Sequence, residues 1–238
     1  MKKVINRIVV MGGLLMVSVP ALAQSVTYRF TPHYNERVEL FEQLTDLDST
    51  KIVMLGNSLT ENAIKVGDWN ELLGSENVVN RGISGDDALG ITNRLVQILP
   101  KQPKAIFLMC GTNDLSHDLT PQEVFEKCKG VIDSIRSGAP NTRLYVQSLL
   151  PINESFGRWK TLEGKTNDIP AINRLLRQYC RQQHIPYINL FPRFTNGKSN
   201  VLRRQLCVDG LHLSKEGYDI WASQLRWYIR EVNEGSWK

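Results

Sequence analysis

Short, continuous runs of apolar residues recur along the chain and are separated by longer segments of mixed character. The runs cover residues 52–55, 78–79, 105–109, 144–150 and 185–191. A short apolar run that is bounded by turn residues is typical of a strand buried inside a sheet. The chain is therefore predicted to contain five strands.

Between and after these runs, apolar residues recur at every third or fourth position, which is the spacing of one face of a helix. This pattern covers residues 124–135, 169–179 and 214–229, and Ser214 is the expected N-cap of the last helix. Further helices are expected over residues 34–44 and over residues 86–99, where Pro100 ends the pattern. Because strands alternate with helices, the predicted fold class is α/β, with a parallel sheet covered by helices on both faces.

The first 23 residues show a different pattern. A basic start is followed by an apolar run over residues 8–19 and by Ala21-Leu22-Ala23. This order is typical of a secretory signal peptide that is cleaved near Ala23. A membrane anchor is the alternative, but the run is well short of the roughly 20 apolar residues that a spanning helix needs. We predict an exported protein, periplasmic or secreted, in which residues 24–238 form a single domain without a stable membrane anchor.

Composition narrows the choice of partners. Hydrophobic residues make up 42% of the chain, which is enough for a large core. The formal net charge is +5, and removal of Lys2, Lys3 and Arg7 with the signal peptide leaves +2. The remainder contains no basic run with interleaved aromatic residues, the pattern of many nucleic-acid-binding segments. A nucleic-acid partner is therefore not expected.

The four cysteines are Cys110, Cys128, Cys180 and Cys207. None forms a C-x-x-C pair and none has a histidine at ligand spacing, so neither a zinc site nor any other metal or cofactor is predicted. Export would permit disulfides, with three possible complete pairings. Cys110 ends an apolar run and Cys128 lies on the apolar face of a helix, positions that are typical of buried free thiols. The sequence leaves both possibilities open.

Small polar turns follow the first three predicted strands. They are Gly56-Asn57-Ser58, residues 80–86 (NRGISGD) and residues 111–114 (GTND). In open parallel sheets, ligands bind outside the carboxyl ends of the strands. The three turns therefore predict a site at one edge of the sheet. Within it, Ser58 is either the cap of the next helix or a nucleophile.

A serine nucleophile needs a base and a group that orients the base. The candidate bases are His33, His117, His184 and His212. His33 precedes the sheet in sequence, and His184 precedes the fifth strand and therefore lies at the opposite edge. His212 belongs to Asp209-Gly210-Leu211-His212, a spacing that lets one turn carry both the base and its carboxylate. This favours His212 over His117.

Four ordered blocks now resemble the GDSL or SGNH hydrolase family: GNSLT at residues 56–60, RGISGD at 81–86, GTND at 111–114 and DGLHLS at 209–214. The turns are most similar to the branch that contains the platelet-activating-factor acetylhydrolase subunits and bacterial carbohydrate acetylesterases. The resemblance covers residues 24–238 and implies a flavodoxin-like three-layer α/β/α sandwich with a five-stranded parallel sheet.

The resemblance also implies roles for individual residues. Ser58 would be the nucleophile, His212 the base and Asp209 the group that orients it. The oxyanion hole would consist of the backbone N–H groups of Ser58 and Gly82 and the side-chain amide of Asn113. Ser58 would also cap the helix that it opens, with its N–H facing the developing negative charge.

One departure from the family is Asn57, which stands where the family name has Asp. That Asp is not one of the catalytic groups in the family. We therefore expect altered hydrogen bonding in the turn rather than lost activity.

Two long connections are predicted at the same edge of the sheet, over residues 151–167 and 192–208. They supply Arg158, Trp159 and Arg193 as candidate substrate-binding residues: an aromatic platform for a sugar ring and cations for an anionic group. The alternative for each residue is a solvated position on a polar surface loop.

The sequence therefore predicts an exported serine esterase that hydrolyses short-chain esters, above all acetyl esters, on a carbohydrate or another small molecule through an acyl-enzyme. A lysophospholipase or thioesterase acting on longer acyl esters is one alternative, and a non-catalytic glycan-binding protein is another. The presence of Ser58, Asp209 and His212 argues against the latter. Acyl transfer in place of hydrolysis, and the oligomeric state, stay open.

Overall fold

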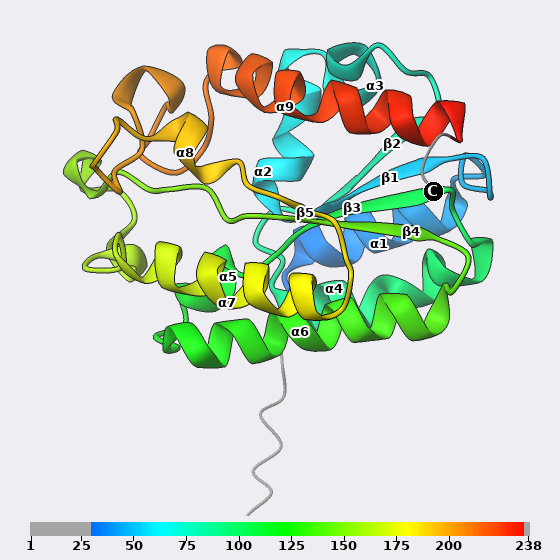
Figure 1. Ribbon diagram of the computed structural model, residues 1–238, viewed down its shortest axis with the longest axis horizontal. Coiled ribbons are helices and arrows are strands. Elements are labelled where there is room, and N and C mark those ends of the chain that lie inside the picture. The colour runs from blue at the N-terminus through cyan, green and yellow to red at the C-terminus, as the bar shows by residue number, and fades with distance from the viewer. Residues whose placement is uncertain (1–29, 236–238) are drawn as a thin grey trace, which may run out of the picture.

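In the computed structural model, residues 30–235 are described, and the predicted signal peptide lies outside them. The centre of the fold is a five-stranded sheet in which all neighbouring strands are parallel, in the order β2-β1-β3-β4-β5 (Figure 1). The strands are Ile52–Gly56 (β1), Val78–Gly82 (β2), Ala105–Met109 (β3), Arg143–Gln147 (β4) and Tyr187–Ile188 (β5). This confirms the predicted α/β class and the parallel sheet.

Helices cover both faces of the sheet, which gives the three layers predicted from the resemblance. Helices α3 and α9 lie on one face, and α4, α6 and α7 lie on the other (Figure 1). The α-helices are Pro32–Gln43 (α1), Ser58–Glu61 (α2), Asp68–Leu73 (α3), Ala88–Arg94 (α4), Thr112–Leu115 (α5), Pro121–Gly138 (α6), Asp168–Gln182 (α7), Phe191–Phe194 (α8) and Lys215–Glu234 (α9).

The ends of the long helices follow from local sequence. Thr120 and Glu123 form a reciprocal capping box at the start of α6. Pro121 occupies the first turn, where its missing N–H donor costs no helical hydrogen bond. The side chain of Ser214 accepts a hydrogen bond from the N–H of Gly217 at the start of α9. The prediction that Ser214 is an N-cap is therefore confirmed.

Two predicted strands are shorter in the structure than the apolar runs suggested. The fourth ends at Gln147 because the N–H of Leu149 donates to Oδ1 of Asn173 on α7, at 2.7 Å, instead of to a strand. The fifth ends at Ile188 because the N–H groups of Leu190 and Phe191 both donate to Oγ of Ser148, at 3.0 Å. In both places a side-chain oxygen, instead of a carbonyl oxygen of the neighbouring strand, accepts the backbone hydrogen bond. Apolar periodicity does not reveal this change of partner.

The helix predicted over residues 86–99 is also shorter. Helix α4 begins after Asp87, whose carboxylate accepts from the N–H of Gly90, and it ends at Arg94. Two short 3₁₀ turns, Leu95–Gln97 and Leu99–Lys101, continue the chain to the next strand. A 3₁₀ turn keeps nearly the same side-chain spacing as an α-helix over one turn, so the sequence pattern does not distinguish them.

The core is continuous from one helical layer through the sheet to the other. All five residues of β1 and all five of β3 are buried. The aromatic rings of Trp69, Tyr218 and Trp221 pack between α3 and α9. No helix within residues 30–235 has the length and apolarity that crossing a membrane requires.

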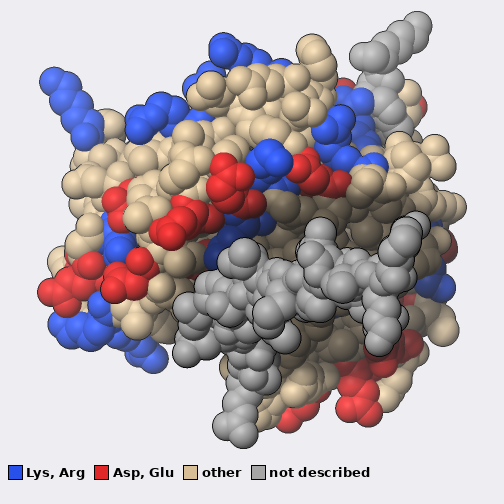
Figure 2. All heavy atoms as spheres, turned by 90° about the horizontal axis from the view of Figure 1, so that it is seen from below, with Lys and Arg blue, Asp and Glu red and all other residues tan. Residues whose placement is uncertain are grey.

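The four cysteines are all buried and free. This resolves the choice that the sequence left open in favour of buried thiols. The thiol of Cys128 donates to the carbonyl oxygen of Cys110 at 3.3 Å. The outer face of the layer that contains α6 carries both signs of charge, with Lys and Arg near Asp and Glu (Figure 2). An example is the ion pair between Lys129 and Asp133, one turn apart on α6.

Candidate active site

The first turn of the site is where β1 meets α2. Oδ1 of Asn57 accepts the N–H of Leu59 at 3.0 Å, so Asn57 is the N-cap and Ser58 is the first residue of the helix. The expectation that Ser58 itself caps the helix is therefore wrong. The amide oxygen of Asn57 makes the capping bond that a carboxylate oxygen of Asp could also make. This explains how the turn forms without the Asp of the family name.

The structure brings Ser58 together with the turn that precedes α9. Nε2 of His212 lies 3.0 Å from Oγ of Ser58, although 154 positions separate the two residues. On the other side of the ring, Nδ1 of His212 lies 2.9 Å from Oδ2 of Asp209. With Nδ1 donating to the carboxylate, Nε2 is left as the acceptor for the hydroxyl proton of Ser58. This is the arrangement that activates a serine nucleophile.

The Asp209–His212 turn is fixed by its own hydrogen bonds. Oδ1 of Asp209 accepts the backbone N–H groups of Leu211 at 3.0 Å and His212 at 2.8 Å. Burial alone would raise the pKa of Asp209, but the hydrogen bonds from the His212 side chain and from the two N–H groups outweigh it and lower the pKa. Gly210 has a φ of +89°, and an added Cβ would lie 2.3 Å from the carbonyl oxygen of Asn153. The turn therefore requires glycine at this position.

The other described histidines have different surroundings. Nδ1 of His117 lies 3.7 Å from Oδ2 of Asp87, and the His117 side chain is 52% exposed. Nε2 of His33 contacts Glu61. His184 follows α7 and precedes β5, at the opposite edge of the sheet. Only His212 contacts Ser58 among the histidines of residues 30–235.

The oxyanion side of the site differs in part from the prediction. Asn113 lines the same cavity as Ser58, and its Nδ2 donates one proton to the carbonyl oxygen of Asp86 at 2.7 Å. Because an amide group has two N–H bonds, the second remains for a ligand. Gly82 does not line this cavity, and its N–H donates to Oδ1 of Asn80 at 2.9 Å. The structure therefore does not support Gly82 as an oxyanion donor.

A different glycine of the same block lines the cavity that contains Ser58. Gly85 lines this candidate catalytic cavity together with Ser58, Ser84 and Asn113, and it has a φ of +82° that favours glycine. Gly82 is glycine for another reason, because a Cβ there would lie 2.2 Å from the backbone nitrogen of Glu61. The RGISGD block contains both glycines, and only the course of the turn shows which one reaches the cavity.

The candidate catalytic cavity has a volume of about 640 Å³. Arg158 and Trp159 both line it, as predicted for the loop over residues 151–167. The ring of Trp159 lies edge-on to the ring of His212, with 5.1 Å between centroids. Nε of Arg158 lies 4.0 Å from Oδ2 of Asp209. Lys65, on the segment after α2, also lines the cavity and was not among the predicted residues.

Arg193 does not reach the cavity. It lies on α8, its side chain is exposed, and its carbonyl oxygen accepts a hydrogen bond from Nη2 of Arg203 at 2.5 Å. The prediction that Arg193 binds substrate is therefore not supported by the structure. The residues just before it begin a short helix instead of extending the loop toward Ser58.

Three buried aspartates lie behind the oxyanion side. Burial raises the pKa of Asp86 to about 6 against the opposing effect of Arg94, whose Nε donates to it at 2.8 Å. Burial and the nearby Asp87 raise the pKa of Asp114 to about 6 as well. Oδ1 of Asp86 is buried without a hydrogen-bond partner. Among the described residues, no group of three or more His, Cys, Asp or Glu side chains is arranged to hold a metal ion.

A sequence profile of the GDSL-like Lipase/Acylhydrolase family matches residues 54–220, which is more than half of the chain. The chain belongs to this family. As a GDSL-type acylhydrolase it is an enzyme that acts on ester bonds. The matched segment contains all four sequence blocks, so the motifs and the family assignment concern the same part of the fold.

Named relatives of this acylhydrolase are similar at low identity. The alpha1 subunit of platelet-activating factor acetylhydrolase IB from Rattus norvegicus is 25% identical over 170 residues, which cover 71% of this chain and 70% of the relative. The fold matches a GDSL-like lipase from Bacteroides thetaiotaomicron with a TM-score of 0.73 and 20% identity, over 84% of this chain and 98% of that one. It also matches an acetyl xylan esterase with a TM-score of 0.62 and 20% identity, over 75% of this chain and 98% of that one.

Proposed function

We propose that this acylhydrolase is an exported serine esterase that removes short acyl groups, above all acetyl, from carbohydrate esters. The observation that carries the proposal is the chain of contacts from Asp209 through His212 to Oγ of Ser58, at 2.9 and 3.0 Å. Such contacts are the requirement for nucleophilic attack by an otherwise weak hydroxyl. Export rests on the pattern of residues 1–23.

The reaction follows from these positions. Nε2 of His212 accepts the proton of Ser58 while Oγ attacks the ester carbonyl carbon and forms a tetrahedral intermediate. The protonated ring of His212 then gives this proton to the leaving alcohol oxygen as the C–O bond breaks, which leaves the acyl group on Ser58. Water attacks the acyl-enzyme with the same proton transfers and releases the acid. Asp209 stabilises the charged ring in both halves.

The negative oxygen of the intermediate needs donors that are already in place. Ser58 is the first residue of α2, so its own N–H has no acceptor within the helix. Gly85 and Asn113 lie in the same cavity on the other side of Ser58. We propose the N–H groups of Ser58 and Gly85 and the free amide N–H of Asn113 as the oxyanion donors.

The short acyl group is supported by polar groups beside Ser58 and by the relatives. Ser84, Asn113 and Ser116 line the cavity on the oxyanion side. Two of the similar proteins, the platelet-activating factor acetylhydrolase subunit and the acetyl xylan esterase, are named for acetyl esters. Trp159, next to His212, offers an aromatic face on which a sugar could lie.

A second candidate is a lysophospholipase or thioesterase with a longer acyl substrate. It is favoured by the apolar residues that line the same cavity, which are Val66, Leu162, Val208, Leu211, Leu213 and Tyr218. Val208 is 63% exposed, so these residues do not form a fully enclosed groove. This observation makes the longer acyl chain the weaker proposal.

A series of p-nitrophenyl esters separates the two candidates. Each methylene that enters an apolar groove would contribute roughly 0.8 kcal/mol, so a groove enzyme gains kcat/KM steeply from acetate to octanoate. We expect the reverse order here: acetate best, butyrate weaker and octanoate very poor. Acetate release from acetylated xylan then tests the carbohydrate part, with Ser58→Ala as the inactive control. A rise in kcat/KM toward octanoate would contradict the acetylesterase proposal.

A further inference from the structure

Glu61 is a buried carboxylate next to the nucleophile that the reaction described above does not use. It is the last residue of α2, three positions after Ser58, and its side chain is only 11% exposed. A buried carboxylate is costly unless it is paired and hydrogen-bonded. Its partners therefore show what holds it in place.

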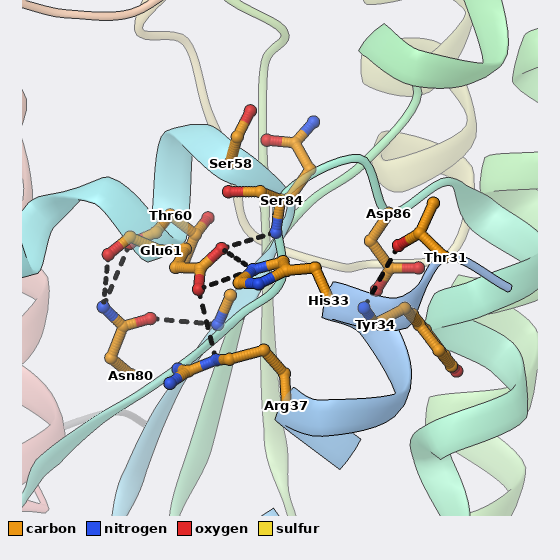
Figure 3. Close-up of polar contacts among 12 residues, drawn as sticks. Thr31, His33, Tyr34, Arg37, Ser58, Thr60, Glu61, Asn80, Ser84 and Asp86 are labelled. Carbon is orange, nitrogen blue, oxygen red and sulfur yellow. Dashed lines mark hydrogen bonds and ion pairs between the residues drawn. The ribbon is translucent and has the colours of Figure 1, made fainter. Parts of the chain in front are cut away.

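Three groups from two other segments surround the Glu61 carboxylate (Figure 3). Oε2 accepts the backbone N–H of Ser84 at 2.6 Å. Nε2 of His33, on α1, lies 3.0 Å from both carboxylate oxygens. Nε of Arg37, one turn further along α1, forms an ion pair with Oε1 at 3.2 Å. Glu61 thus joins three segments: the helix of the nucleophile, the turn after β2 and the N-terminal helix.

The contact with Ser84 is the one that reaches the site. Ser84 directly precedes Gly85, and both residues line the catalytic cavity. Since Gly85 has a φ of +82°, its N–H direction depends on a turn conformation that few residues adopt. A short hydrogen bond from a backbone N–H to a charged acceptor is stronger than one to a neutral group. The hydrogen bond from Ser84 to Glu61 therefore fixes the turn directly before Gly85, whose N–H is a proposed oxyanion donor.

The backbone of α2 also touches the other end of the turn. An added Cβ on Gly82 would lie 2.2 Å from the nitrogen of Glu61, so the start of the turn lies directly against the helix. Ser58 and Gly85, which supply the two backbone donors, are in this way connected through Glu61. Burial would raise the pKa of Glu61, but the hydrogen bonds from Ser84 and His33 outweigh it and lower the pKa, so the carboxylate is charged at neutral pH.

We propose that Glu61 is a positioning residue that holds the Ser84–Gly85 turn in the geometry required by the oxyanion, while His33 and Arg37 on α1 hold the carboxylate. The proposal rests on the serine-esterase function proposed above. It assigns a catalytic consequence to α1, a helix that precedes the whole sheet in sequence.

The test compares Glu61→Ala and Glu61→Gln with wild type in the full chain, with p-nitrophenyl acetate as substrate. Loss of a complete oxyanion donor lowers kcat about 10²–10³-fold, so displacement of one by Glu61→Ala is expected to lower kcat by about 10–100-fold with KM nearly unchanged. Glu61→Gln keeps an acceptor for Ser84, but a neutral one that is roughly half as strong, and should lose about 3–10-fold.

A second measurement separates positioning from a structural role. Methylboronic acid forms a tetrahedral adduct on an active serine, so its inhibition constant reports on the oxyanion donors. We expect this constant to weaken in parallel with kcat in both Glu61 variants. A residue that only supports the fold would lower the thermal unfolding midpoint and leave both readouts near wild type at temperatures where the variant is folded.

Tyr34→Phe is the matched control. Tyr34 also lies on α1 and its hydroxyl donates to the carbonyl oxygen of Gly90 at 2.8 Å, without touching Glu61. Tyr34→Phe removes one hydrogen bond of α1 but none of the partners of Glu61, so kcat should stay near wild type. The proposal is overturned if Tyr34→Phe lowers kcat as much as Glu61→Gln does. It is also overturned if Glu61→Gln changes kcat by less than about twofold, because a change of that size is no larger than the effect of one weak hydrogen bond. If Glu61→Ala does not fold, the result for Glu61→Gln decides the question. An active Ser58→Ala variant would instead refute the proposed function.

Discussion

The two sides of Ser58 are built in different ways. On the proposed proton-transfer side, Asp209 and His212 lie within four residues of chain and are held by hydrogen bonds inside that turn. On the proposed oxyanion side, Gly85 and Asn113 come from two separate strand ends, and buried carboxylates lie behind them. The first side depends on local sequence, and the second depends on packing between segments. Substitutions should therefore affect the two sides differently.

The largest effect is expected on the proton-transfer side. His212→Ala should lower kcat by about 10⁴–10⁶-fold, which is the scale for removing one member of a serine–histidine–aspartate triad. His117→Ala should leave kcat near wild type, because His117 is half-exposed and contacts Asp87 instead of Ser58. Steady-state kinetics with p-nitrophenyl acetate measure both. If His117→Ala were inactive and His212→Ala active, the assignment of the base would be wrong.

The next effect is expected on the oxyanion side. Asn113→Ala should lower kcat by about 10²–10³-fold, because one donor to the oxyanion is removed. KM should change little, since the donor acts on charge that develops only in the transition state. A loss confined to KM would show that Asn113 binds the ground state. In that case the oxyanion side would consist of backbone donors alone.

The buried carboxylates should make stability depend on pH. Folding raises the pKa values of Asp86 and Asp114 from 3.8 to about 6, so the folded state binds more protons than the unfolded state between these values. Their contribution to stability is present below about pH 4 and is lost as the pH rises through about 6. Asp209 and Glu61, whose pKa values are lowered, contribute with the opposite sign and lose stability in acid.

Asp114→Asn isolates one of these groups. Its amide oxygen can still accept the N–H of Ala88, which donates to Oδ2 of Asp114 at 3.0 Å. At pH 7 the variant should be more stable than wild type by about 1–3 kcal/mol, the equivalent of one to two pKa units. The gain should shrink toward pH 4, as measured by urea unfolding at several pH values. A gain that is constant with pH would show that Asp114 is not the group that titrates.

The smallest effect concerns the charges around the cavity. Arg158→Ala should raise KM for an acetylated acidic sugar by about 2–5-fold, in line with the weak energies of exposed charge pairs. The effect should fade in high salt, because salt screens exposed charges. Arg193→Ala is the matched control, since Arg193 is equally basic but lies outside the cavity. Equal effects of the two substitutions would indicate that the overall electrostatic field of the protein attracts the substrate, instead of a contact of Arg158 within the site.

The loops that carry these two arginines show where sequence patterns stop being informative. Both loops are polar, basic and partly aromatic, yet only the first brings Arg158 and Trp159 to His212. The second loop reaches the cavity only with Val208 at its end, and elsewhere it packs against the first: the guanidinium of Arg204 lies 4.3 Å from the ring centroid of Phe156. Composition cannot distinguish a loop that lines a site from one that packs behind it, because the difference lies in contacts between the loops.

The sequence by itself determined the parallel sheet and the residues at the carboxyl ends of its strands, and it was enough to predict Ser58, Asp209 and His212 as a group whose side chains the structure brings into contact. Alternating apolar runs fix which segments become strands, and all parallel strands end at the same edge. The pair Asp209 and His212 is recognisable because hydrogen bonds within four residues hold it. These features depend on periodicity and short-range bonding, which the order of residues encodes directly.

Only the tertiary structure decided that Gly85, and not Gly82, faces the cavity and that Glu61 joins α1 to the turn beside it. Gly82 and Gly85 are three residues apart in one turn, and the direction of each N–H depends on how that turn packs against α2. His33 and Glu61 are 28 positions apart and belong to no motif. Such contacts arise from the docking of complete elements, and the packing of the whole core determines where each element docks.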